Sequence, residues 1–142
     1  MALVSEPVNP YGNLGIGAVI YKDNQEVFAY SEYVAASKSN SSNVAEYLAL
    51  EQILLWIRDN NTLESKIFIY GDSKLVIMQM KGFWRIKNGL YVESALRCKK
   101  IRSEIEKSLV FEWIPRELNS RADDLSKGKM IENNVEFKIQ PQ

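Results

Sequence analysis

Apolar residues recur along this chain with two different spacings, and each spacing predicts a different kind of element. Short runs that alternate or are continuously apolar, bounded by turn residues, predict strands. The predicted strands span residues 14–21, 26–35, 66–70 and 109–114. Helical spacing predicts helices over residues 44–57, 73–80 and 90–107. A last helix is expected to begin at Asn119 or Ser120, and residues 135–139 are expected to form a small edge strand.

The order of these elements predicts an α/β fold. The first two strands form an antiparallel hairpin, and the later strands alternate with helices as parallel strands do. The helix over 44–57 is apolar almost all round, so we expect it to be buried at the centre. A chain of 142 residues without a repeat or a linker is the size of one domain.

Composition narrows the class of protein. Hydrophobic residues make up 46% of the chain and the net charge is zero, so no overall field attracts a polyanion, although a local basic face would. Cys98 is the single cysteine, which excludes an intrachain disulfide and a zinc–thiolate cluster and favours a reduced, cytoplasmic setting. No signal-peptide pattern opens the chain, and no apolar run is long enough to span a membrane.

Three acidic residues stand where predicted elements begin or end: Glu46, Asp72 and Asp123. The chain has no histidine, and carboxylates without imidazole or paired thiols suit hard cations such as Mg²⁺ or Mn²⁺. Two such ions promote phosphodiester hydrolysis. Taken singly, each acid also has an ordinary interpretation: a capping acid in a first helical turn for Glu46, a helix N-cap for Asp72, and a surface acid for Asp123.

A second candidate feature is the segment Phe83-Trp84-Arg85-Ile86-Lys87, which mixes aromatic and basic residues. Such a mixture is typical of surfaces that follow a nucleic-acid strand, because bases stack on rings and phosphates pair with cations. The alternative is a core Trp84 flanked by solvated charges.

Four fragments of the chain, in order and in register, resemble the ribonuclease H family, specifically its compact type 1 form in archaea and bacteria. The fragments are Asn9-Pro10 with 15–21, Asn43 to Tyr47, 71–76 with Gln79 and Gly82, and 113–117 with Asn119 and Asp123. The resemblance extends from about residue 5 to residue 126. It implies a three-layer fold with a five-stranded mixed sheet flanked by helices. It also implies cleavage of the RNA strand of an RNA–DNA hybrid by two divalent ions held by four carboxylates.

The resemblance assigns three of the four metal-binding acids to Glu46, Asp72 and Asp123. Asp123 is preferred to Asp124 because the family's acid follows an alanine, and Asp124 is then expected on the surface. Arg116 lies in the loop where many members place a histidine that assists the attacking water or product release.

The resemblance also implies contacts with the nucleic acid. Asn43 is similar to the residue that hydrogen-bonds ribose hydroxyls in the minor groove, which is how RNA is told from DNA. Asn9 and Gln79 are similar to further nucleic-acid contacts, and Trp84 belongs to the aromatic and basic segment described above.

The family's first carboxylate has no counterpart in this chain. It should fall near Ala2, where the sequence reads Met1-Ala2-Leu3-Val4-Ser5-Glu6. The chain is truncated or engineered, or it uses another oxygen ligand, with Glu6 the only nearby candidate, or it is a relative that binds hybrids without cutting them. In each case we expect a truncated first strand, and residues 135–139 are the candidate to pair in its place.

Three functions therefore stay open. The first is a Mg²⁺- or Mn²⁺-dependent endonuclease acting on RNA–DNA hybrids. The second is a module that binds hybrid or double-stranded RNA without cutting it, and the third is a structural or interaction domain on the same scaffold. We expect a monomer whose partner is an RNA–DNA hybrid, with no membrane and no disulfide partner.

Overall fold

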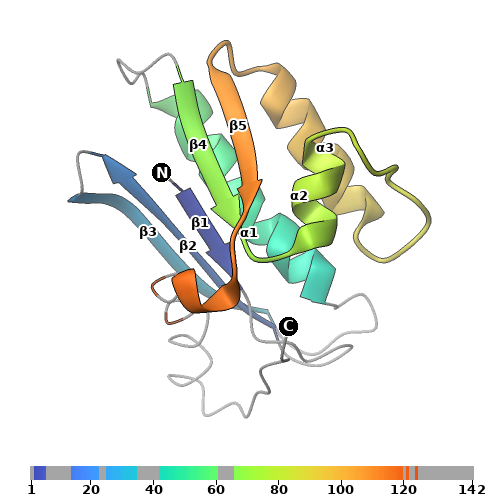
Figure 1. The fold of residues 1–142 in the computed structure, drawn as a ribbon, viewed down its shortest axis with the longest axis horizontal. Coiled ribbons are helices and arrows are strands. Elements are labelled where there is room, and N and C mark those ends of the chain that lie inside the picture. The colour runs from blue at the N-terminus through green and yellow to red at the C-terminus, as the bar shows by residue number, and fades with distance from the viewer. Residues whose placement is uncertain are drawn as a thin grey trace.

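The chain builds a five-stranded mixed sheet with helices packed on one face (Figure 1). The computed structural model describes residues 2–5, 14–22, 25–34, 42–60, 66–119, 121 and 124. The strands are β1 (Ala2–Ser5), β2 (Leu14–Lys22), β3 (Gln25–Val34), β4 (Lys66–Gly71) and β5 (Ser108–Trp113). The helices are α1 (Ser42–Asp59), α2 (Lys74–Met80) and α3 (Val92–Ser103), followed by one turn of 3₁₀ helix, η1 (Arg116–Leu118).

The sheet has the strand order β3-β2-β1-β4-β5. The pairs β1–β2 and β2–β3 are antiparallel, and the pairs β1–β4 and β4–β5 are parallel. The α/β fold class, the hairpin and the mixed sheet predicted from the sequence are therefore confirmed.

The short strand β1 fills the centre of the sheet. Residues 2–5 pair with residues 20–17 of β2, and residues 2–4 pair with residues 69–71 of β4. The first strand is short, as expected, but the expectation that another segment replaces it is wrong. Four residues are enough to bridge both neighbours, and the candidate segment 135–139 lies outside the described residues.

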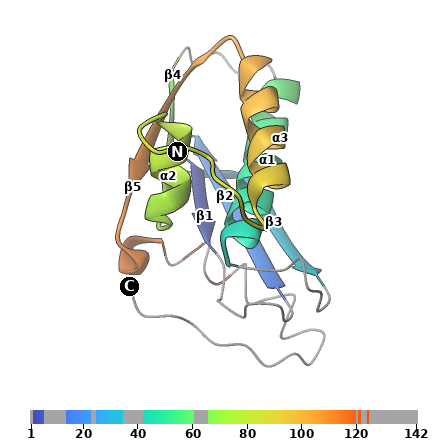
Figure 2. The ribbon, with the colours of Figure 1, turned by 90° about the vertical axis from the view of Figure 1, so that its right-hand side faces the viewer.

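One hydrophobic core lies between the sheet and the helices (Figure 2). Helix α1 packs across β1 and β2, α3 packs on α1, and α2 packs against β4 and β5. Leu50, Ile53 and Leu54 of α1 are at most 1% exposed, which confirms the buried central helix expected from its apolar surface. No helix in the described part of the chain is both long enough and apolar enough to cross a membrane.

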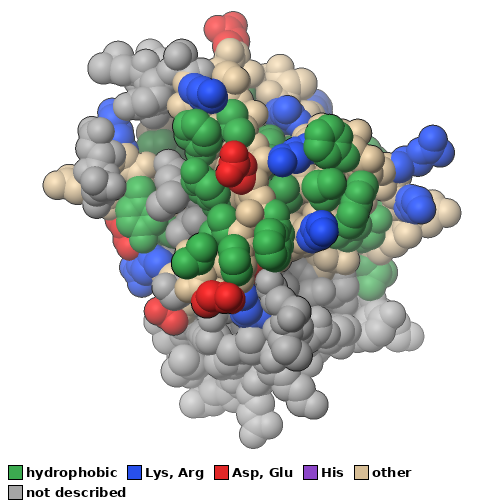
Figure 3. Space-filling view, in the orientation of Figure 1, with side chains coloured by type: hydrophobic (Ala, Val, Ile, Leu, Met, Phe, Trp, Pro, Cys, Tyr) green, Lys and Arg blue, Asp and Glu red, His purple; other side chains and the backbone are tan. Residues whose placement is uncertain are grey.

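The other face of the sheet carries a smaller apolar layer. Val19 is buried there against Tyr21, Tyr70 and Ile114. Figure 3 shows hydrophobic side chains gathered over β4 and β5 on this face. Of the last helix expected here, only residues 121 and 124 are described, so the third layer of the expected fold lies outside the described residues.

Helix α3 is shorter than the predicted 90–107. The backbone N–H groups of Glu104 and Ile105 reach back only three residues, to Ile101 at 2.9 Å and Arg102 at 3.0 Å, so the last turn tightens and the helix ends. Ala95, Cys98 and Ile101 follow one another at helical spacing, and all three are buried on the inner side of α3.

Candidate functional site

Two acidic side chains are buried at one end of the molecule. The parallel strands β1, β4 and β5 end there, and Figures 1 and 2 show α1 beginning at the same end. Glu46 lies near the start of α1 and is 0% exposed, while Asp72 directly follows β4 and is 7% exposed. Buried carboxylates are uncommon because the charge loses its hydration, so this end of the sheet is the candidate site.

Asp72 is fixed by contacts from later parts of the chain. Its carboxylate Oδ2 accepts a hydrogen bond from Asn119 Nδ2 at 3.1 Å. Its backbone carbonyl accepts one from the indole N–H of Trp113 at 3.1 Å. These contacts hold the carboxylate and the backbone of Asp72 in one orientation.

The structure rejects the ordinary interpretations of Glu46 and Asp72. The N-cap of α2 is Ser73, whose hydroxyl accepts from the N–H of Val76 at 3.3 Å, so Asp72 does not cap that helix. Helix α1 begins at Ser42 and has no acid in its first turn, so Glu46 is not a capping acid either. Neither residue is placed by helix capping.

Asn119 is the site residue that sequence reasoning missed. The sequence predicts it as the start of a helix, whereas the structure places it after η1 as a fully buried side chain on Asp72. No local sequence pattern predicts this contact, because its partner, Asp72, lies 47 residues away in the sequence.

The structure describes only some of the other predicted site residues. Asn43 is half-buried in the first turn of α1, and Arg116 is half-buried in η1. Asn9 and Asp123 lie outside the described residues. Among the described residues, no group of three acidic, His or Cys side chains could hold a metal ion. The third acid that the sequence predicts for such a group is Asp123, which is not among these residues. Asp124 is exposed, as predicted.

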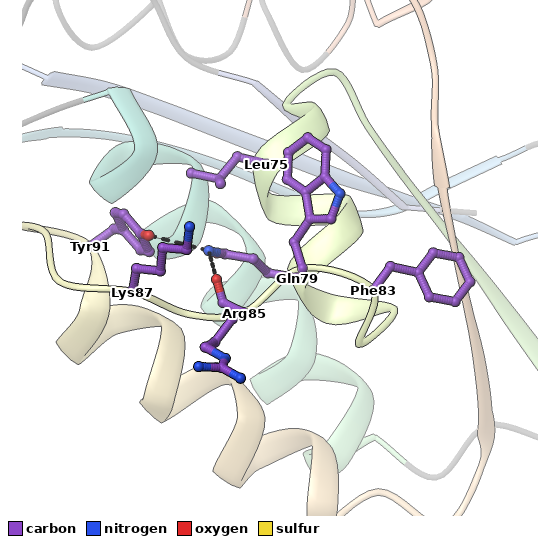
Figure 4. Close-up of a pocket in the computed structure, with 7 residues that line it drawn as sticks. Leu75, Gln79, Phe83, Arg85, Lys87 and Tyr91 are labelled. Carbon is purple, nitrogen blue, oxygen red and sulfur yellow. Dashed lines mark hydrogen bonds between the residues drawn. The ribbon is translucent and has the colours of Figure 1, made fainter.

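A basic surface with exposed rings follows α2. Residues 73–92 include four cations and no acid, in a chain whose net charge is zero. We define the basic aromatic surface as Lys81, Phe83, Trp84, Arg85 and Lys87, all of which are exposed. Trp84 is 43% exposed, so the interpretation of this residue as a core tryptophan is wrong. A pocket of ≈ 420 Å³ opens beside it (Figure 4).

Gly82 turns the chain from α2 into this surface. Its φ of +84° lies in the left-handed region, which glycine adopts at little cost. The N–H of Gly82 bonds to the carbonyl of Gln79 at 3.1 Å, and the N–H of Phe83 to that of Met78 at 3.0 Å. This helix end leads the chain away from the core at Phe83 and Trp84.

Gln79 lies beneath this surface rather than on it. It is 0% exposed and its Oε1 accepts from the Tyr47 hydroxyl at 2.6 Å, while Nε2 donates to the carbonyl of Arg85 and the hydroxyl of Tyr91. Burial raises the pKa of Tyr47, so its hydroxyl keeps its proton and donates. The expectation that Gln79 contacts nucleic acid directly is therefore corrected. The sequence does carry a signal: Gln79 follows the buried Val76 by three residues and shares its helix face.

The profile of the family described as "Reverse transcriptase-like" matches residues 9–129. The chain belongs to this family. It is a ribonuclease H-type domain, and the family resemblance predicted from its motifs is confirmed.

The ribonuclease H-type fold recurs in solved structures. LC11-RNase H1, in a complex with an RNA/DNA hybrid, superposes with a TM-score of 0.80 at 27% identity, over 95% of this chain and 100% of that chain. The N-terminal RNase H domain of Rv2228c from Mycobacterium tuberculosis gives a TM-score of 0.76 at 23% identity, over 94% and 95% of the two chains. The second match shows the fold alone.

Two curated relatives are longer proteins. The bifunctional protein Rv2228c of Mycobacterium tuberculosis is 32% identical over 123 residues, which cover 86% of this chain and 32% of the relative. YpeP of Bacillus subtilis is 26% identical over 122 residues, covering 86% and 54%. The ribonuclease H-type domain thus spans about a third of the first relative and about half of the second.

Proposed function

We propose that this domain binds RNA–DNA hybrids and hydrolyses their RNA strand with the help of Mg²⁺ or Mn²⁺. The observation that carries the proposal is the burial of Glu46 and Asp72 at the end of the sheet where three parallel strands terminate. LC11-RNase H1, which shares the fold, has been crystallised with an RNA/DNA hybrid. The same chain thus combines a buried acidic end with the fold of a hybrid-binding protein.

The residues at this end fit a hard divalent cation. Glu46 and Asp72 offer carboxylate oxygens, the ligands that Mg²⁺ and Mn²⁺ prefer, and a bound cation would offset the cost of burying two negative charges. We propose Asp123 as a third ligand. When bound, two such ions supply an activated water and stabilise the charge that develops on the leaving oxygen. Asn119 contributes by fixing the rotation of the Asp72 carboxylate.

Binding of the polyanion is assigned to the basic aromatic surface. Its exposed cations neutralise phosphates, and the exposed rings of Phe83 and Trp84 offer stacking surfaces to bases or sugars. The surface is tied to the acidic end by chain connectivity, because α2 follows Asp72 directly and Tyr47, which follows Glu46, bonds to Gln79 beneath the surface. We propose that a hybrid held by this surface extends to the acids.

Recognition of the RNA strand is assigned to Asn43. It lies in the first turn of α1, three residues before Glu46, and its amide can both donate to and accept from a ribose hydroxyl. We propose Asn9 as a further contact, and Arg116 as the cation that assists release of the cleaved phosphate. Arg116 stands three residues before Asn119, the partner of Asp72, and this closeness along the chain supports the proposal.

A second candidate function is hybrid or double-stranded RNA binding without cleavage. The observation that favours it is the sequence of β1, whose residues Ala2–Ser5 include no acid although the strand runs beside β4 to the acidic end. The strand register shows how far β1 runs toward that end: Ala2 lies opposite Ile69, three residues before Asp72, and Val4 lies opposite Gly71, one residue before it.

Binding and cleavage of one labelled RNA–DNA hybrid separate the two candidates. Affinity is measured in EDTA, and cleavage is measured after Mg²⁺ or Mn²⁺ is added to the same complex. Binding followed by metal-dependent cutting supports the nuclease, and binding without cutting supports the second candidate. A chain that does neither contradicts both. The expected monomer stays a prediction.

A further inference from the structure

A buried amide joins the basic aromatic surface to the central helix. Gln79 accepts from the hydroxyl of Tyr47 on α1 at 2.6 Å. Its Nε2 donates to the carbonyl of Arg85 at 3.1 Å and to the hydroxyl of Tyr91, just before α3, at 3.2 Å (Figure 4). Both hydrogens of the amide nitrogen thus have acceptors, and one side chain bridges α1, the connection that carries the surface, and the start of α3.

The segment between α2 and α3, which carries the basic aromatic surface and which we call the connection, depends on side-chain bonds of this kind for its position. Backbone hydrogen bonds tie residues 81–84 to the end of α2, whereas residues 85–90 lie beyond these bonds and outside any helix or strand. The Arg85 carbonyl is held by the buried amide while the Arg85 side chain is exposed. Farther along, the ring of Tyr91 stacks on that of Tyr47, with centroids 6.1 Å apart and planes at 14°.

Close packing around Tyr91 supports a fixed position of this ring. A Cβ added at Gly89 would lie 2.8 Å from Cε1 of Tyr91, so the backbone approaches the ring where only glycine fits without movement. The ring is therefore held by the backbone at Gly89, by the stack on Tyr47 and by the bond from Gln79.

From this geometry we propose that Gln79 is a positioning residue that sets the orientation of Trp84, Arg85 and Lys87 relative to α1. The inference rests on the proposed function and deepens it. Gln79 acts through Arg85 and Tyr91 and does not touch the nucleic acid, because it is fully buried. Because α1 also carries Glu46, the Gln79 amide fixes the position of the basic aromatic surface relative to the acidic end of the sheet, where we propose that cleavage takes place.

The test uses the intact chain and three variants. Gln79→Met keeps the side-chain length and removes the amide. Tyr47→Phe removes only the hydroxyl that donates to the Gln79 amide. The Tyr47 side chain is 0% exposed, so it cannot contact a ligand itself. Tyr30→Phe removes the same atom from a tyrosine on β3, away from this network, and is the matched control. Thermal unfolding establishes that each variant is folded.

The first measurement is the affinity for a short RNA–DNA hybrid in EDTA as a function of KCl concentration. Gln79→Met is expected to bind about five- to tenfold more weakly, and its slope of log K against log salt to be shallower by about one, the loss of one phosphate contact. Tyr47→Phe is expected to change both quantities in the same direction, and Tyr30→Phe neither. A residue that mattered only for stability would leave the slope unchanged.

The second measurement is amide hydrogen exchange over residues 83–91 without nucleic acid. Faster exchange in Gln79→Met and Tyr47→Phe than in the parent supports the positioning role, and parent-like exchange overturns it. Parent-like affinity and slope in both variants overturn it as well. If the parent binds no hybrid, the proposed function fails while the exchange result still decides whether Gln79 holds the connection.

Discussion

Asn119 and Asp72 form a buried pair in which the amide Nδ2 donates to the carboxylate Oδ2 at 3.1 Å. Asn119 is 0% exposed and Asp72 is 7% exposed. The pair ties the chain after η1 to the end of β4, so the orientation of a proposed metal ligand depends on a residue 47 positions away. The acidic end is therefore assembled by tertiary contacts and not by one local motif.

Replacing Asn119 by Ala is expected to destabilise the fold and to slow cleavage. The loss of a bond to a buried carboxylate costs about 1–3 kcal/mol of unfolding free energy. Urea unfolding measures that loss, and single-turnover cleavage measures the rate. Asn88→Ala, at an exposed asparagine of the connection before α3, is the control. Unchanged stability in Asn119→Ala would show that the pair contributes nothing.

Glu46→Gln is expected to abolish stabilisation by Mg²⁺. Glu46 is fully buried and burying a charge costs free energy, so the metal-free variant, which lacks this charge, should be more stable than the parent by about 1 kcal/mol or more. Addition of Mg²⁺ should raise the melting temperature of the parent but not that of Glu46→Gln. The matched control is Glu51→Gln on the same helix, where the carboxylate pairs with Arg97 at 2.8 Å. An equal response to Mg²⁺ in Glu46→Gln and the parent would remove Glu46 from the site.

Val4→Asp is expected to raise the rate of metal-dependent cleavage. Of the β1 residues that pair with β4, Val4 lies nearest the acidic end, because it is opposite Gly71, the residue before Asp72; the variant tests whether a carboxylate on this part of β1 supplies a further oxygen ligand. A gain of about tenfold corresponds to roughly 1.4 kcal/mol in the activation barrier. Ala2→Asp places the same charge opposite Ile69, farther from Asp72, and should give no gain. A gain in Ala2→Asp alone would contradict the strand register.

Stability is expected to fall at alkaline pH because of Cys98. Burial raises the pKa of this thiol above its ordinary value of 9.0, with a further contribution from the charge of Glu51. Below pH 9 the thiol is protonated in both states and its contribution is complete; above pH 9 the unfolded chain loses the proton while the folded chain keeps it. The free energy of unfolding should then fall by about 1.4 kcal/mol per pH unit from this group.

Urea unfolding between pH 7 and pH 10 measures this decline, and Cys98→Ala should flatten it. Burial raises the pKa of Tyr47 in the same way, so a second decline is expected above its ordinary value of 10.0. A decline between pH 9 and pH 10 that is equally steep in Cys98→Ala would contradict the assignment to the thiol.

The hairpin, the central helix and the buried strands could be predicted from the sequence because their patterns are local. Strand β1 escapes such reasoning because four residues carry no periodicity, and its place is set by pairing with residues 17–20 and 69–71. The contact of Asn119 could not be predicted from local patterns either, because its partner, Asp72, is distant in the sequence. For Gln79 the family motif predicts a contact with nucleic acid, whereas the helix periodicity, which puts it on the face of the buried Val76, predicts its burial.

The most direct test of the account is single-turnover cleavage of a labelled RNA–DNA hybrid in Mg²⁺ and in Mn²⁺ by the parent chain and by Asp72→Asn. Asp59→Asn, at the exposed end of α1, is the control. The account predicts metal-dependent cutting of the RNA strand by the parent and by Asp59→Asn, and none by Asp72→Asn. No cutting by the parent in either metal, or equal cutting by Asp72→Asn, would contradict it.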